Sequence, residues 1–96
     1  MLDEIIASFK NKDIADIWGQ SEILYKSKDN INSLLDYFNI VFFNKLLSTK
    51  DDRYIFAIKT VEITKKRLSS NANFDMCIDN LLLKIWEAFN ENNNRS

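Results

Sequence analysis

Acidic side chains stand in adjacent pairs at two places, Asp3-Glu4 and Asp51-Asp52, and paired carboxylates are common in acid–base catalysis. Such catalysis usually adds a histidine or a cofactor motif, and the sequence contains neither. Both pairs also fall where helices are predicted to begin, and a carboxylate there is stabilised by the helix dipole. We therefore predict that they serve helix starts, that the chain has no catalytic residue and that it is not an enzyme.

The thiol of Cys77 is the next reactive group, and it is the only cysteine in a chain without histidine. A disulfide within the chain and a Cys/His zinc site are both excluded. Because the neighbours of Cys77 in sequence are apolar, a buried thiol is predicted rather than a reactive one. The single glycine, Gly19, excludes a Walker phosphate loop, whose backbone must approach phosphate closely. No cofactor and no metal are expected.

A run of cations, Lys65-Lys66-Arg67, has the chemistry to contact nucleic-acid phosphates or an acidic protein surface. It falls in the last turn of a predicted helix, where the dipole favours positive charge. The net charge of −1 provides no excess of cations, so direct DNA binding is predicted to be weak or absent. Solvated cations at a helix end are the simpler interpretation. The alternative is a helical nucleic-acid-binding module that also uses Lys10, Lys12, Lys26 and Lys28.

The composition is that of an ordinary globular chain, with 46% apolar and 28% charged residues. No proline and one glycine leave few turn signals for strands, whereas helices tolerate this composition well. We predict an all-α fold, a compact bundle of about five helices in a single domain of residues 1–96, with 91–96 as a frayed tail. No segment approaches the roughly 20 apolar residues of a membrane span, and the start lacks a secretory signal, so a cytoplasmic chain is expected.

Apolar periodicity predicts a short first helix from Leu2 to Phe9 and a second that begins near Asp13. Gly19 costs the second helix about 1 kcal/mol relative to alanine, so either a neighbouring helix passes close to it or the helix is locally weak. A third helix, from about Asp29 to Leu47, is apolar on two sides, which is typical of a central helix. The residues on these two sides are Ile31, Leu34, Leu35, Phe38 and Phe42, and Tyr37, Ile40, Phe43 and Leu47.

Thr49 and Asp52 have the spacing of a capping box, which predicts the start of a fourth helix. Its inward residues are expected to be Tyr54, Ile58, Val61 and Leu68. Two ion pairs are predicted at i,i+4 spacing, Glu22 with Lys26 and Glu62 with Lys66. Trp18 and Trp86 are predicted to lie in the core or at its edge.

The connection to the last helix contains two asparagines at close spacing. Asn71 tolerates the left-handed backbone that ends a helix. Asn73 is a good N-cap for the next helix, because its side-chain oxygen can accept from the N–H of Asp75 or Met76. The last helix then carries apolar residues at helical spacing, namely Phe74, Ile78, Leu81, Leu82, Ile85 and Phe89.

This connection resembles the C-terminal end of bacterial DNA polymerase III clamp-loader subunits. There a basic residue and a leucine, two further residues, Asn-x-Asn and a helix with a Leu-Leu pair close the chain. The matching residues are Arg67, Leu68, Asn71, Asn73 and Leu81-Leu82-Leu83.

Within that family the delta-prime type is the most similar, because the gamma/tau type more often carries an Arg and a Glu inside the last helix. This chain has Asp75-Met76 and Asp79-Asn80 there. Two departures are Phe74, where the family often has proline, and Asn44-Lys45, which replaces a frequent Arg-Asp pair.

The resemblance implies a non-catalytic collar domain, through which clamp-loader subunits assemble into a ring that loads sliding clamps onto primed DNA. The implied partners are the gamma/tau and delta subunits, and no membrane is involved. A complete subunit is much longer, so Met1 need not be the native start. The subunit interface is expected near the turn and the last helix, at Arg67, Lys84 and Glu87. A free-standing helical adaptor, whose resemblance reflects helical periodicity alone, stays an alternative.

Overall fold

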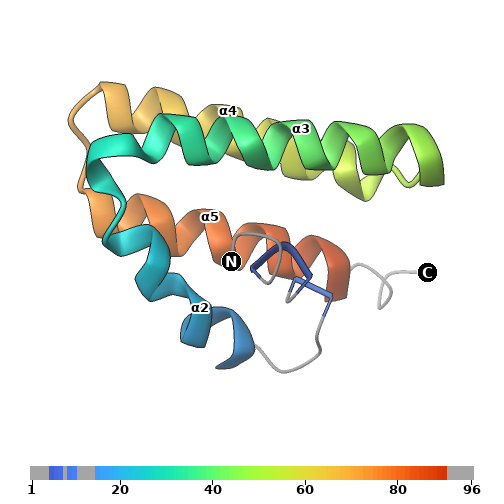
Figure 1. Ribbon diagram of the computed structural model, residues 1–96, viewed down its shortest axis with the longest axis horizontal. Helices are drawn as coiled ribbons and strands as arrows, with labels where there is room; N and C mark the ends of the chain where they lie inside the picture. Colours follow the sequence, from blue (N-terminus) through green and yellow to red (C-terminus); the bar gives the residue numbers. More distant parts are fainter. Residues whose placement is uncertain (1–4, 8, 11–14, 91–96) are drawn as a thin grey trace.

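The computed structural model describes residues 5–7, 9–10 and 15–90, apart from the side chains of residues 16 and 20 (Figure 1). The described residues form helices and short connections, and no strand occurs among them. Residues 5–7 are helical, and the later elements are α2 (Ala15–Tyr25), the 3₁₀ turn η1 (Lys28–Asn30), α3 (Ile31–Thr49), α4 (Arg53–Ser69) and α5 (Phe74–Asn90). The predicted all-α bundle is confirmed. The predicted start of the second helix near Asp13 lies outside the described residues.

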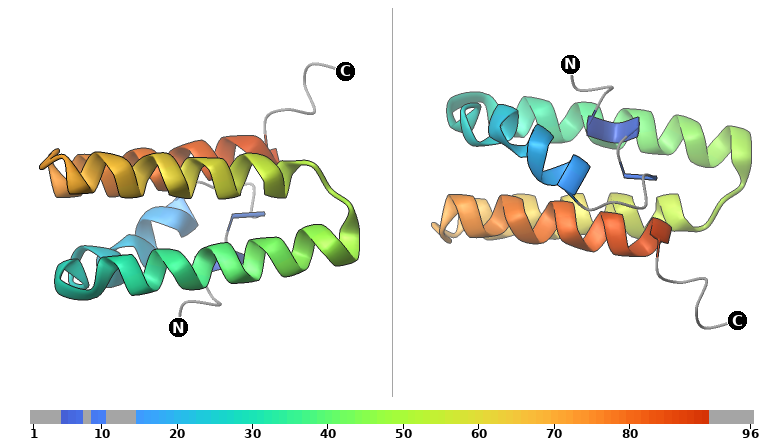
Figure 2. Two further views of the ribbon diagram at one scale, coloured as in Figure 1. Left: turned by 90° about the horizontal axis from the view of Figure 1, so that it is seen from above. Right: turned by 90° about the horizontal axis from the view of Figure 1, so that it is seen from below.

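The helices pack in a chain of neighbours: α3 lies on α4, α4 on α5, and α5 on α2. Figure 1 and Figure 2 show that α3 and α4 run side by side in opposite directions and that α5 runs antiparallel to α4. Residues 5–7 and 9–10 fill the space between α3 and α5 (Figure 2). The helix α4 therefore has a neighbour on each of two sides.

The core is continuous across all these elements, and aromatic rings cross it. The ring of Phe9 packs edge-on against Phe38 at 6.5 Å, and Tyr54 links Phe42 at 6.1 Å to Phe89 at 5.0 Å. The inner side of α4 also includes Ala57, Thr60 and Thr64, which the apolar pattern omits. The apolar core of the whole molecule consists of Ile5, Phe9, Ile17, Leu24, Ile31, Leu35, Phe38, Phe42, Tyr54, Ala57, Val61, Ile78, Leu81, Leu82, Ile85 and Phe89.

The prediction that α3 is central is wrong. Its first predicted side is buried or half-buried, but the second side faces solvent, with Ile40 60% exposed, Phe43 51% and Leu47 52%. Tyr37 is 36% exposed. The physical reason is that α3 lies at the edge of the bundle, because α4 and the N-terminal residues cover only one of its sides.

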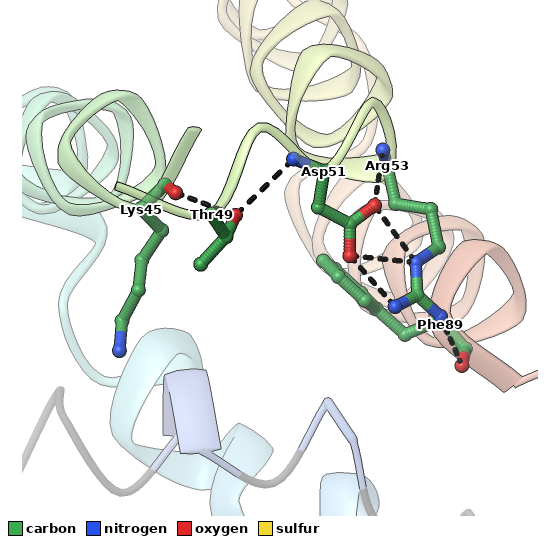
Figure 3. A network of polar contacts seen from close by, with 5 residues as sticks. All are labelled: Lys45, Thr49, Asp51, Arg53 and Phe89. Carbon is green, nitrogen blue, oxygen red and sulfur yellow. Dashed lines mark hydrogen bonds and ion pairs between the residues drawn. The ribbon is translucent and has the colours of Figure 1, made fainter. Parts of the chain in front are cut away.

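The predicted capping box at Thr49 is also wrong, as Figure 3 shows. Thr49 is the last residue of α3, and its hydroxyl donates to the carbonyl of Lys45 at 2.7 Å. Asp52 precedes α4 without a side-chain cap, and the role passes to Asp51, which accepts the N–H of Arg53 at 3.0 Å.

Arg53 joins the start of α4 to the end of α5. Its guanidinium donates to both carboxylate oxygens of Asp51, at 2.7 to 3.0 Å, and to the carbonyl of Phe89 at 3.3 Å (Figure 3). These hydrogen bonds from Arg53 hold the pKa of Asp51 below its ordinary value of 3.8. The Asp51 carboxylate and the Arg53 guanidinium thus tie the α3–α4 turn to the end of α5, while the Thr49 hydroxyl accepts the N–H of Asp51 within the turn at 3.2 Å.

One of the two predicted i,i+4 ion pairs forms. Lys26 Nζ lies 3.2 Å from Glu22 Oε2, on the exposed side of α2. The other is wrong, because Glu62 turns toward α3 instead, where it accepts from Asn39 Nδ2 at 2.6 Å. The hydrogen bond between Asn39 of α3 and Glu62 of α4 thus forms in place of the predicted Glu62–Lys66 ion pair within α4.

Gly19 lies inside α2, and a Cβ built on it meets no atom within 4 Å. A close helix crossing is therefore not the reason for this glycine. We expect Gly19→Ala to raise the free energy of unfolding by about 0.5–1 kcal/mol, since alanine restricts the unfolded chain and favours the helix. Urea unfolding measures this change, and an unchanged or lowered midpoint contradicts it.

Leu81 is fully buried in α5. Leu81→Ala is expected to lower the free energy of unfolding by about 2–5 kcal/mol, through lost burial and the cavity that remains. Met76, 70% exposed on the same helix, provides the matched control, because Met76→Ala is expected to change stability by less than about 0.5 kcal/mol. Equal effects of the two substitutions in thermal or urea unfolding contradict the core described above.

Asp51 is expected to make the free energy of unfolding depend on pH in the acidic range. Its pKa is lower in the folded chain than in the unfolded chain, so its contribution is present above pH 4 or so and is lost as pH falls through the folded value. Asp51→Asn should cost about 1 kcal/mol at pH 7 and much less at pH 3. Urea unfolding at both pH values measures the difference, with Asp52→Asn as control. A cost that does not change with pH contradicts this role.

Candidate interaction surfaces

The α4–α5 turn has the geometry that its asparagines suggest. Asn71 has a φ of 65°, in the left-handed region, directly after α4. Its N–H donates to the carbonyl of Leu68 at 3.2 Å, and the N–H of Ala72 donates to the carbonyl of Arg67 at 3.1 Å. This pair of bonds is the Schellman motif, which satisfies the last carbonyls of a helix. The chain reverses sharply here because both bonds close around one left-handed residue.

The next helix is capped within the same turn. Asn73 Oδ1 accepts the N–H of Met76 at 3.0 Å, one of the two partners expected for it. The acidic Asp75 stands in the first turn of α5, where the dipole favours it. Two residues later Cys77 is buried, as predicted, so its thiol is not presented to solvent. The turn therefore ends α4 and starts α5 through local bonds alone.

A notch lies between this turn and the start of α3. It has a volume of about 330 Å³. Its apolar floor consists of the buried Ile31 and the half-buried Leu68 and Phe74. Lys28 of η1 lines the rim, with Nζ 5.8 Å from the centre of the Phe74 ring. We call the hollow lined by Lys28, Ile31, Asn32, Leu68, Asn71 and Phe74 the turn notch.

A second hollow of about 390 Å³ adjoins the turn notch and shares Asn32 and Ser69 with it. Lys65 lines this hollow, but it hydrogen-bonds Asp36 of α3 and lies 3.9 Å from Glu62. The bond to Asp36 raises the pKa of Lys65. Within the predicted basic run, Lys65 therefore forms ion pairs with carboxylates. Lys66 and Arg67 are exposed and pair with no acidic group in the described chain.

A second surface lies on the outer side of the α3–α4 pair. Ile40, Phe43 and Leu47 follow one another at i, i+3 and i+7 and so share one face of α3. Ile55 of α4 is 39% exposed. We call these four residues, Ile40, Phe43, Leu47 and Ile55, the outer stripe.

Two bonds between α3 and α4 show that the outer stripe is a single surface. Asp36 meets Lys65 and Asn39 meets Glu62, so rising numbers on α3 meet falling numbers on α4. Phe43 stands seven residues after Asp36, and Ile55 seven residues before Glu62, so both share the face that carries these bonds. In this register Leu47 reaches the level of Ile55. A contiguous apolar surface of this kind marks an interaction site more often than isolated exposed residues do.

The three predicted interface residues do not form one cluster. Arg67 is exposed in the last turn of α4, next to the reversal. Lys84 is exposed and Glu87 half-buried on α5. Lys84 follows Phe74 by ten residues, which corresponds to about 15 Å along the helix axis. Any partner that touches all three must therefore extend along α5.

The remaining polar contacts are structural. Tyr25 of α2 donates its hydroxyl to Asp79 of α5, and this hydrogen bond raises the pKa of Tyr25. Trp86 is half-buried against the core, as predicted, whereas Trp18 is 37% exposed and is not among the side chains that pack on the core. The hydrogen bond from Tyr25 to Asp79 therefore joins α2 to α5.

No set of three or more His, Cys, Asp or Glu side chains among the described residues has the spacing to hold a metal ion. Likewise, none of the described helices combines the length and the apolar character needed to cross a membrane. The candidate interaction surfaces in this part of the chain include the outer stripe, the turn notch and the exposed cations Lys66 and Arg67.

Comparison of the chain with protein-family models, with curated proteins and with solved structures finds no match. The interpretation of the surfaces therefore rests on their own geometry and on the residues of the α4–α5 turn.

Proposed function

We propose that this chain is a non-catalytic assembly domain that joins its protein to neighbouring subunits through helix-on-helix contacts. The observation that carries the proposal is the outer stripe, whose apolar side chains are 39–60% exposed although the fold has a continuous core elsewhere. The described residues leave this surface exposed. Burial of such a surface against another protein gains roughly 25 cal/mol per Å² of apolar area.

More specifically, the proposed assembly is the collar of a bacterial DNA polymerase III clamp loader, with this chain as the delta-prime type. The choice of this family rests on the sequence resemblance of residues 67–83; in the structure Asn71 ends α4 and Asn73 caps α5, which are roles that any helical turn of this kind needs. The paired leucines Leu81 and Leu82 are fully buried, as expected of a helix that closes the domain. The task of the domain is then mechanical: it holds its subunit in the ring beside gamma/tau and delta, in the cytoplasm, during DNA replication.

The composition of the outer stripe and its surroundings suits such an interface. Stable interfaces have an apolar centre, a polar rim and a total buried area of about 1,600 Å². Phe43 lies at the middle of the stripe, and the polar pairs of Asp36 with Lys65 and of Asn39 with Glu62 lie next to its Ile40 end. The stripe alone is smaller than a whole interface, so the proposal adds Arg67, Lys84 and Glu87 as contacts of a partner that reaches the turn and α5.

Phe43→Glu tests the apolar centre. The substitution places a charge in the docked surface, and we expect it to weaken co-sedimentation with gamma/tau and delta at least tenfold, which corresponds to about 1.4 kcal/mol. Thermal unfolding should change little, because Phe43 is 51% exposed. Phe56→Glu is the matched control, since Phe56 is 45% exposed but follows Ile55 on a different face of α4.

Other outcomes favour other functions. If the unchanged chain does not co-sediment with the subunits, the collar proposal is contradicted. It is also contradicted if a variant that combines Phe43→Glu with charge reversals at Arg67 and Lys84 still forms the complex. Homodimers that Phe43→Glu dissociates indicate the helical adaptor. Strongly salt-dependent retention on single-stranded DNA, lost on reversal of Lys66 and Arg67, indicates the nucleic-acid-binding module.

A further inference from the structure

We propose that the turn notch is a peptide-binding site, which takes one leucine-sized apolar side chain flanked by carboxylates from an extended segment of a partner protein. The notch is lined by the first residues of α3 and the last residues of α4, whereas Leu47 and Ile55 of the outer stripe stand near the opposite ends of these two helices, which run antiparallel (Figure 1). This inference goes beyond the assembly function and does not depend on it.

The floor of the turn notch selects an apolar side chain. Ile31, Leu68 and Phe74 come from three different helices and meet there without closing over the hollow. The volume of about 330 Å³ is at the low end for ligand pockets, which range over roughly 300–1,000 Å³. The notch therefore suits one side chain of a peptide better than a cofactor-sized molecule.

The rim selects negative charge beside that side chain. Lys28 projects over the Phe74 ring with its Nζ 5.8 Å from the ring centre, and no carboxylate of the described chain pairs with it. Lys66 lines the adjoining hollow, and Arg67 lies in the same turn. Because these cations have no acidic partner among the described residues, a carboxylate on either side of the inserted side chain gains a charge-assisted contact without breaking one of theirs.

Two asparagines supply contacts for the backbone of the peptide. Asn32 and Asn71 line the turn notch and are exposed. An amide side chain both donates and accepts, so it can pair with the N–H and C=O groups of an extended segment. The site thus offers an apolar, a cationic and an amide contact within one hollow.

The same features do not suit nucleic acid. A base has to stack on an open aromatic face, and Lys28 covers the face of Phe74. A phosphate backbone needs a continuous track of cations, but the hollow next to the notch contains Glu62, and Lys65 there is bonded to Asp36. A short acidic peptide requires only the few cations that are present.

The test is a titration of the full 96-residue chain, isotopically labelled, with an acetylated pentapeptide Asp-Glu-Leu-Asp-Gly while amide chemical shifts are recorded by NMR. Saturable shifts are expected at Ile31, Leu68 and Phe74. The comparison peptides Asn-Gln-Leu-Asn-Gly and Asp-Glu-Ser-Asp-Gly remove the charge or the apolar side chain, and each should raise Kd at least about fivefold.

Lys28→Glu should raise Kd for the acidic peptide at least about tenfold, by replacing attraction with repulsion. Lys59→Glu is the matched control: Lys59 is an exposed lysine of α4 that lines neither hollow, and its reversal should change Kd less than about twofold. If Lys28→Glu alters the spectrum of the free protein, Lys28→Gln makes the same comparison with the charge removed.

Four results overturn the proposal. The first is the absence of a saturable shift up to about 5 mM peptide, a concentration that corresponds to a binding free energy of only about −3 kcal/mol. The second is a set of shifts confined to residues away from the turn notch. The third is equal binding of the comparison peptides, and the fourth is tighter binding of a thymidine oligonucleotide at the same residues. Failure here leaves co-sedimentation through the outer stripe unaffected, so the two proposals are tested separately.

Discussion

The contact between α4 and α5 is the one on which the rest of the fold depends. The helix α3 packs on α4 and α2 packs on α5, so neither outer helix has a place unless the inner two are joined. Both ends of the inner pair are fastened: one by the reversal at Asn71, the other by the bond from Arg53 to the carbonyl of Phe89. Between these ends the pair is held by burial, with Val61 and Leu81 fully enclosed.

That arrangement explains why α3 exposes apolar residues. A helix at the edge of a bundle has one covered side, and α3 buries Leu35, Phe38 and Phe42 there. Its opposite side, with Ile40 and Phe43, cannot reach the core without removing the first set. The exposure is therefore a property of the topology, and only a second molecule, or chain outside the described residues, can cover this side of α3.

Much of the fold follows from local pattern. Apolar spacing is enough to predict α3, α4 and α5, and the short-range chemistry of asparagine is enough to predict how Asn71 and Asn73 divide the last two helices. The pattern fails where the structure is determined by a contact with a residue far away in the sequence. It indicates that both sides of α3 are apolar but not which side is covered. Glu62 bonds Asn39 of another helix in place of Lys66, and Thr49 is drawn into α3 by the carbonyl of Lys45.

The candidate surfaces were predictable to different degrees for the same reason. The exposed cations Lys66 and Arg67 belong to a run visible in the sequence, and the four residues of the outer stripe are visibly apolar. The turn notch was not predictable, because Lys28 and Phe74 are far apart in the chain and meet only after α3 and α5 have packed. The spacing of residues within a single helix does not predict this contact.

Residues that folding itself requires carry little information about partners. Asn71 and Asn73 are fully explained by helix termination and capping, whatever the protein assembles with. The exposed Phe43 and the cation of Lys28 over Phe74 are different, because neither is needed to close the core. Exposed apolar area gives folding no stability, and a cation over a partly solvated ring gives about 0.5–1 kcal/mol at most. Function is therefore better sought at these two places than at the turn whose asparagines are the most recognisable part of the sequence.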